Sequence, residues 1–120
     1  SLVVAQAAVT ALVSAFGDSM LSLRLRDLPT GYEAYLVTPL SNEEAKRETC
    51  RIEDTHPLGR LFDLDVIDAD GVPMSRESVG LSPRKCLVCD NEARYCMRNR
   101  THTMAELTAK IDEMIESYVR

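Results

Sequence analysis

The stretch HPLGRLFDLDV at residues 56–66 decides how we interpret the fold, because it joins a turn to an apolar strand pattern that carries two aspartates. Pro57 and Gly59 favour a loop, and the residues after Arg60 alternate in character. One face of such a strand would pack, and the other would carry both carboxylates. The two predicted faces are formed by Phe62, Leu64 and Val66, and by Leu61, Asp63, Asp65 and Ile67.

Asp63 and Asp65 are spaced so that they can share a metal ion. Residues two apart on a strand have Cα atoms roughly 6.6 Å apart, so both carboxylates can reach one divalent ion or a closely spaced pair. Hard oxygen ligands favour Mg²⁺ or Mn²⁺ over Zn²⁺. The alternative is an ordinary half-solvated strand, although two aspartates on one face weaken a strand and repel each other, a cost that a cation would offset.

The composition predicts a single domain over residues 1–120. The chain is 45% hydrophobic and 28% charged, and its net charge of −5 argues against general nucleic-acid binding. We find neither a membrane-spanning run nor a signal peptide, so we expect a cytoplasmic location without a membrane partner. Because the sequence opens directly into a helical pattern without an initiator methionine, we expect it to be a fragment of a longer protein.

The first half of the chain contains two helical patterns and one hairpin pattern. Residues 2–16 form an apolar helical pattern with one thin polar stripe, which predicts a helix buried on most sides. Residues 21–26 and 32–38 alternate on either side of a Pro-Thr-Gly turn and predict a hairpin. A capping box that begins at Ser41 predicts a mostly polar helix through about Ile52.

The second half predicts one more strand and two helices. The turn at residues 68–71, with Gly71 in a left-handed conformation, predicts a strand over residues 72–79 that pairs with the aspartate strand. Residues 80–100 predict a loop and a short helix, and a capping box at Thr103 opens an amphipathic final helix. Since strands and helices do not alternate regularly, we predict an α+β fold with a mixed or antiparallel sheet and helices mainly on one face.

Three cysteines and a histidine follow the spacing Cys-x2-Cys-x6-Cys-x5-His, formed by Cys86, Cys89, Cys96 and His102. Three thiolates and an imidazole can complete a tetrahedral Zn²⁺ shell, and a Cys-x-x-Cys pair is a common first half of one. Buried reduced thiols and redox or disulfide chemistry are the alternatives that this pattern leaves open.

The segment between Arg76 and Arg100 is locally basic in an acidic chain. A solvated charged face is the ordinary interpretation, but guanidinium groups beside paired carboxylates also suit a polyphosphate site, to which Arg60 would belong. His56, held extended by Pro57, could contact phosphate, act as a general base, or have no functional role. The basic residues of the segment are Arg76, Arg84, Lys85, Arg94, Arg98 and Arg100.

HPLGRLFDLDV, followed by SPRKCLVC and CMRNRTH, resembles the CitX family of citrate lyase holo-acyl-carrier-protein synthases over about residues 54–103. The resemblance implies an enzyme that transfers the 5-phosphoribosyl-dephospho-CoA group from 2'-(5-triphosphoribosyl)-3'-dephospho-CoA to a serine of the citrate lyase acyl carrier protein, the gamma subunit. Pyrophosphate leaves. A small zinc-stabilised interaction module and a non-enzymatic carrier-docking domain are the alternatives.

The same resemblance implies a nucleotidyltransferase-like core, because Asp-Leu-Asp-Val at residues 63–66 is similar to the signature of that superfamily. Gly59-Arg60 stands where the superfamily has an upstream Gly-Ser element. Members also carry an N-terminal Pro-Gly-Pro-x-Lys segment that is absent here, so we expect an N-terminally truncated transferase domain. The implied catalytic residues are Asp63 and Asp65 with Mg²⁺, Arg60 and His56, and the implied substrate-binding residues are Gly59, Arg76, Arg84 and Lys85.

Overall fold

The computed structural model describes residues 2–120, which divide into two compact units, Ser1–Met74 and Ser75–Arg120. We call them the N-terminal unit and the C-terminal unit. The described residues form four α-helices and one two-stranded antiparallel sheet, so the predicted α+β class with an antiparallel sheet is confirmed. The single domain over residues 1–120 stays a prediction. Within the described residues, no helix combines the length and apolarity needed to cross a membrane.

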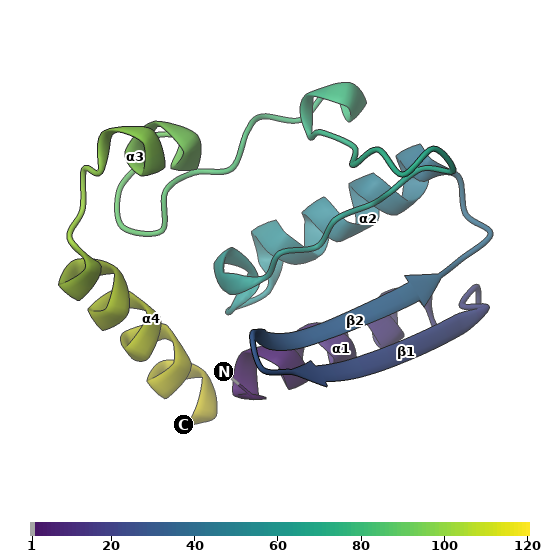
Figure 1. The fold of residues 1–120 in the computed structure, drawn as a ribbon, viewed down its shortest axis with the longest axis horizontal. Coiled ribbons are helices and arrows are strands. Elements are labelled where there is room, and N and C mark those ends of the chain that lie inside the picture. Colours follow the sequence, from purple (N-terminus) through teal and green to yellow (C-terminus); the bar gives the residue numbers. More distant parts are fainter. Residues whose placement is uncertain (1) are drawn as a thin grey trace. The chain divides into compact units, whose positions relative to one another are not determined.

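The N-terminal unit begins with helix α1, Leu2–Phe16, which lies along the hairpin (Figure 1). The helix itself is confirmed, but its predicted burial on most sides is wrong. Only Ala7 and Phe16 are buried among its described residues, and Leu2 and Val13 are exposed. The reason is that β2 and α2 contact only limited parts of α1, so the rest of its apolar surface has no covering element among the described residues.

The predicted hairpin is confirmed as strands β1, Ser22–Leu28, and β2, Gly31–Val37. The strands are antiparallel, with Leu23 opposite Leu36 and Leu25 opposite Ala34. These residues share one face because side chains two apart on a strand point to the same side. Both strands are largely exposed, so the sheet contributes little to the core.

Helix α2, Asn42–Thr55, supplies one side of the core of the N-terminal unit. The Ser41 hydroxyl accepts a hydrogen bond from the Glu44 N–H at 3.2 Å, as the predicted cap requires. Although the helix is polar in composition, its buried face includes Ile52 and packs near the short 3-10 helix η1, Gly59–Leu61. Leu58 and Phe62, which flank η1, are buried and complete this core.

The predicted pairing of the aspartate strand with a strand over residues 72–79 is wrong. The two segments share only one bridge, between Ile67 and Pro73, and the structure assigns no strand to residues 62–66. The two hydrogen bonds of this bridge lie beside the turn, from the Asp68 N–H to the Val72 carbonyl at 3.1 Å and from the Met74 N–H to the Val66 carbonyl at 2.9 Å. Aspartates are poor strand formers, which agrees with the end of the pairing there. The turn itself is as predicted, since Gly71 has a φ of 78° and its N–H donates to the Asp68 carbonyl at 3.0 Å.

The C-terminal unit consists of 3-10 helix η2, Glu77–Val79, helix α3, Ala93–Asn99, and helix α4, Met104–Val119. The short helix, the final helix and the reciprocal capping box between Thr103 and Glu106 were predicted and are confirmed. None of the residues of α4 is buried. Its apolar stripe is therefore half-covered at most, and the unit has little apolar interior.

Candidate functional site

The aspartate segment, residues 62–66, is extended and keeps the predicted alternation without being a strand. Phe62 is buried, Leu64 and Val66 are half-buried, and Asp63 and Asp65 are exposed. The prediction that both carboxylates share one side of the segment is therefore consistent with the observed burial. The difference from the prediction is that no ladder of strand hydrogen bonds holds the backbone of residues 62–66.

A buried carboxylate from α2 holds the aspartate segment instead. The Glu53 side chain is 5% exposed, and its Oε2 accepts a hydrogen bond from the Leu64 N–H at 3.1 Å. A hydrogen bond to a charged acceptor in a buried position is stronger than one between neutral groups. Glu53 thus fixes the backbone directly between the two aspartates, a contact that the sequence patterns did not predict.

Gly59 allows α2 and the turn after it to approach closely. A Cβ atom on Gly59 would lie 2.2 Å from the Glu53 carbonyl oxygen and 2.8 Å from that of Ile52. No side chain fits there without a backbone shift. This contact gives Gly59 a packing role in the structure, whereas the sequence had suggested substrate binding.

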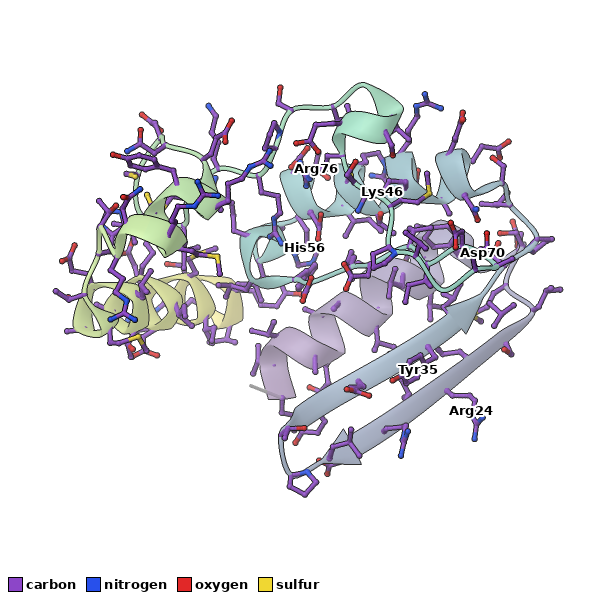
Figure 2. All side chains as sticks on the ribbon, turned by 45° about the horizontal axis from the view of Figure 1, so that its top comes forward. Arg24, Tyr35, Lys46, His56, Asp70 and Arg76 are labelled. Atoms are coloured by element: carbon purple, nitrogen blue, oxygen red, sulfur yellow. The ribbon has the colours of Figure 1, made fainter. Side chains whose placement is uncertain are left out.

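His56 shapes the turn that leads into η1. Its Nδ1 accepts a hydrogen bond from the Leu58 N–H at 2.9 Å, and its ring lies 4.8 Å from the Phe62 ring, centroid to centroid. Burial lowers the pKa of His56 below its ordinary value, so the imidazole is neutral near pH 7. Figure 2 shows His56 and Asp70 near the two ends of the stretch that carries the aspartates.

The remaining predicted phosphate-binding residues are divided between the two units. Arg60 lies on η1 in the N-terminal unit, three positions before Asp63. Arg76 precedes η2 in the C-terminal unit, and Arg84 and Lys85 form one side of its cysteine loop. The N-terminal unit therefore brings together five of the predicted site residues, His56, Gly59, Arg60, Asp63 and Asp65.

Two hollows of the N-terminal unit meet at the aspartate segment. One, of about 300 Å³, is lined in part by Asp63, Asp65 and the start of α2. The other, of about 960 Å³, lies between α1 and the hairpin and also reaches Asp63. Asp63 is therefore accessible to a ligand bound in either hollow, and Asp65 to a ligand bound in the smaller one.

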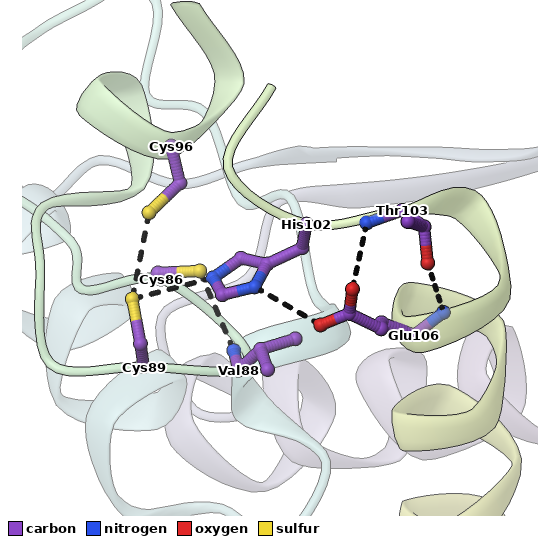
Figure 3. Close-up of polar contacts among 7 residues, drawn as sticks. All are labelled: Cys86, Val88, Cys89, Cys96, His102, Thr103 and Glu106. Atoms are coloured by element: carbon purple, nitrogen blue, oxygen red, sulfur yellow. Dashed lines mark hydrogen bonds and ion pairs between the residues drawn. The ribbon is translucent and has the colours of Figure 1, made fainter. Parts of the chain in front are cut away.

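Cys86, Cys89, Cys96 and His102 form the cluster that their spacing predicted (Figure 3). One potential ligand atom from each lies within 4.8 Å of all the others. The Cys89 Sγ is 3.5 Å from the Cys96 Sγ and 3.3 Å from the His102 Nε2. Ligand atoms around a tetrahedral Zn²⁺ are separated by roughly 3.5–3.8 Å, given its usual bond lengths. The cluster can therefore hold a metal ion.

A short backbone loop presents the first two thiols of this cluster. The Cys86 N–H donates to the Asn91 carbonyl at 2.7 Å and the Ala93 N–H donates to the Arg84 carbonyl at 2.8 Å, which closes the loop. The Val88 N–H points at the Cys86 Sγ, 3.4 Å away. Burial raises the pKa of Cys86, but hydrogen bonds from the Val88 and Cys89 N–H groups and from the Cys96 and Cys89 side chains outweigh burial and lower the pKa to about 7.

The other two ligand residues are placed by the helices that follow. Cys96 lies within α3, where burial and the hydrogen bond with Cys89 raise its pKa to about 11. His102 precedes α4, and its Nδ1 lies 3.4 Å from the Glu106 Oε2. Its hydrogen bond with Cys89 is the main cause that raises the pKa of His102. Metal-bound histidines are usually oriented by such an outer carboxylate, and no sequence pattern had assigned Glu106 this contact.

Comparison with known proteins gives a consistent family. A family model described as "Apo-citrate lyase phosphoribosyl-dephospho-CoA transferase" matches residues 3–118. A protein of Streptococcus pyogenes serotype M18 named as a probable enzyme of this kind is 37% identical over 114 residues, which cover 92% of this chain and 59% of the relative. A Vibrio cholerae protein with the same name is 47% identical over 90 residues, covering 74% of this chain and 51% of the relative.

A third relative is a longer protein. Haemophilus influenzae "Protein CitXG" is 37% identical over 110 residues, which cover 92% of this chain but 24% of that protein. The chain spans between half and three fifths of the length of the two other relatives. These matches agree with the family resemblance over residues 54–103. The chain therefore belongs to the CitX family, the apo-citrate lyase phosphoribosyl-dephospho-CoA transferases.

Proposed function

We propose that the protein containing this chain transfers the 5-phosphoribosyl-dephospho-CoA group from its triphosphate precursor to a serine of the citrate lyase acyl carrier protein, with release of pyrophosphate. Family membership and the names of the relatives support this reaction. The observation that carries it is the exposed pair Asp63 and Asp65, on a segment anchored by Glu53 and bordering two hollows. Carboxylates placed in this way suit a metal-assisted attack on a phosphate.

Asp63 and Asp65 would hold Mg²⁺. Their oxygen donors fit this ion, which proteins commonly bind through one or two carboxylates, with substrate phosphates and waters as the other ligands. When bound, the ion neutralises charge on the triphosphate. Among the described residues, no third carboxylate or other metal ligand forms a group with this pair. The pair therefore suits a site in which the substrate phosphates supply the remaining Mg²⁺ ligands.

The neighbouring groups have separate roles in the proposal. Arg60 would donate hydrogen bonds to the departing pyrophosphate, with Arg76, Arg84 and Lys85 as further phosphate contacts. His56 stays neutral and accepts the Leu58 N–H, so its first role is to hold the turn before Arg60. We further propose that the whole protein has a nucleotidyltransferase-like core and works in the cytoplasm.

Mass spectrometry of the carrier protein tests the reaction. The protein is incubated with apo-carrier, 2'-(5-triphosphoribosyl)-3'-dephospho-CoA and Mg²⁺, and the carrier should gain the mass of the prosthetic group. Asp63→Asn and Asp65→Asn should each lower the rate by about 10²–10³-fold, because each removes a charge that acts on the phosphates. Asp70→Asn, an exposed change in the following turn, is the matched control. Near-normal transfer by either aspartate variant would reject this assignment.

For the cysteine cluster we propose Zn²⁺ as the bound ion. Three sulfurs and one imidazole nitrogen are a common ligand set of structural zinc sites, and none of the four cysteines is in a disulfide. When bound, Zn²⁺ would hold the loop and helices together and take no part in the chemistry. Protein purified under reducing conditions should contain one zinc per chain by atomic spectrometry, whereas a cluster of reduced thiols would contain none.

A further inference from the structure

The C-terminal unit has almost no apolar core. Among residues 75–120, Val79, Cys86 and Cys96 are the buried hydrophobic side chains, and α4 contributes none. Segments shorter than about 70 residues rarely gain enough stability from a core alone, and natural ones add disulfides or a metal. The cysteines of the chain form no disulfide. Two of the three buried hydrophobic side chains of this unit, those of Cys86 and Cys96, thus belong to potential metal ligands.

The cluster connects the separate segments of this unit. Cys86 and Cys89 lie in the backbone loop, Cys96 lies in α3, and His102 lies in the linker that precedes α4. An ion bound to all four residues would cross-link these segments at one point. Because all four ligands come together only in the folded unit, the free energy of binding the ion stabilises the fold, as the burial of an apolar core otherwise would.

Glu106 connects the cluster to the first turn of α4. One carboxylate oxygen, Oε2, lies 3.4 Å from the His102 Nδ1, and the other, Oε1, accepts the Thr103 N–H at 3.2 Å. The Glu106 N–H in turn donates to the Thr103 Oγ1 at 3.1 Å. The same side chain thus orients a ligand and closes the N-terminus of the helix (Figure 3).

We propose that residues 75–120 form a metal-dependent folding unit, in which one ion held by Cys86, Cys89, Cys96 and His102 takes the place of an apolar core. Glu106 is a positioning residue that couples the ion to the start of α4. Binding displaces protons from three thiols and uses the neutral imidazole. The inference rests on the proposed Zn²⁺ in the cluster and is independent of the transferase reaction.

Hydrogen exchange of the whole chain, read by mass spectrometry at peptide resolution, tests the coupling. Zinc-loaded chain is compared with chain stripped by a chelator under reducing conditions, and then with stripped chain given one equivalent of Zn²⁺. Amides of α3 and α4 should lose their protection on stripping and regain it on addition, whereas amides of α1 and α2 keep theirs. Unchanged protection of α3 and α4 in the stripped chain would overturn the proposal, and so would an equal loss of protection in both units.

Two pairs of variants locate the effect. Cys86→Ser should lose zinc and the protection of α3 and α4, whereas Cys50→Ala, a buried cysteine of α2, should keep both. A Cys86→Ser chain with full protection of both helices contradicts the proposal. Glu106→Gln preserves a side chain that can close the capping box but weakens the acceptor for His102, and it should lower zinc affinity by about 10–100-fold. Glu113→Gln on the same helix is the control, and an equal effect of both changes would remove the positioning role.

The measurements separate the possible failures. A chain that binds no zinc in a competition assay rejects the proposed occupancy and this inference together, and leaves the carrier-modification assay unaffected. A chain that binds zinc tightly, yet keeps α3 and α4 protected when stripped, rejects only the dependence of folding on the metal. Loss of prosthetic-group transfer in the Asp63→Asn variant supports the role of the aspartate pair. Normal zinc content in the same variant shows that the cysteine cluster binds its ion independently of that pair.

Discussion

The N-terminal unit and the C-terminal unit differ in what lies at their centres. In the first, Leu58 and Phe62 pack against the buried face of α2, and Leu58 is fully buried. In the second, two of the three buried hydrophobic side chains are cysteines. Apolar burial stabilises by about 25 cal/mol per Å² and works best with large side chains, which the C-terminal unit keeps half-exposed on α4.

This difference has a consequence for the candidate sites. The aspartate segment depends on an apolar core and on one buried hydrogen bond, so changes in that core should disturb it without affecting the cysteine cluster. The cluster depends on its own ligands and on Glu106. Measuring both stability and zinc content in one variant therefore tests whether the two units respond separately.

Leu58→Ala should have the largest effect in the N-terminal unit. Leu58 is fully buried, and truncation of such a leucine leaves a cavity that costs about 2–5 kcal/mol. Urea unfolding followed by hydrogen exchange should show the loss in α2, while zinc content stays at that of the wild type. Leu25→Ala is the control, because Leu25 is 63% exposed and its loss should change stability little. Zinc loss in the Leu58 variant would show that the units do not fold separately.

Gly59→Ala should come next, at about 3 kcal/mol, because its Cβ would collide with the backbone carbonyls of Glu53 and Ile52. The turn would have to move away from α2, and the aspartate segment with it. The control is Gly80→Ala in the C-terminal unit, where φ is 78° and nothing lies within 4 Å of the added Cβ. That change should cost only the strain of a left-handed residue, about 1–2 kcal/mol. Equal losses would mean that the collision at Gly59 is relieved cheaply.

Local patterns predicted the helices, the hairpin and the turn at Gly71, because caps, periodicity and turn residues act within a few positions. Ser41 and Thr103, for example, are the N-cap residues of α2 and α4. The spacing of Cys86, Cys89, Cys96 and His102 also predicted a cluster, because the loop and the short helix that connect them are too short to place them far from one another. The alternation through residues 62–66 likewise agrees with the observed burial of Phe62.

Tertiary contacts account for what the patterns missed. A strand exists only if a partner strand pairs with it, and among the described residues the pairing beside the turn is limited to the bridge between Ile67 and Pro73. The hydrogen bond from Leu64 to Glu53 spans eleven positions and depends on the close approach at Gly59. One signal could have indicated Glu53, since it follows Ala45 and Thr49 at intervals of four on the buried face of α2.

Glu53→Ala should lower the stability of the N-terminal unit by about 2 kcal/mol, because the Leu64 N–H would lose a buried charged acceptor. The same change should release the aspartate segment and reduce prosthetic-group transfer, although Glu53 is not proposed to touch the substrate. Glu53→Gln keeps a carbonyl oxygen in the same place and should recover a substantial part of the stability. If the glutamine variant is as unstable as the alanine variant, the hydrogen bond is not what holds the segment.

The smallest effects should come from the two helix caps. Because each unit has one of these caps, the same substitution can be compared directly between the two units. Ser41→Ala and Thr103→Ala each remove a side chain that accepts a hydrogen bond from the N3 N–H of its helix, at a cost of about 1 kcal/mol. In the N-terminal unit this loss should appear in urea unfolding alone. In the C-terminal unit the cap adjoins His102 and shares Glu106 with it, so about 1 kcal/mol should also weaken zinc binding roughly fivefold. Competition with a chromogenic chelator measures the zinc affinity of both variants. Equal zinc affinities would show that metal binding is not coupled to the start of α4.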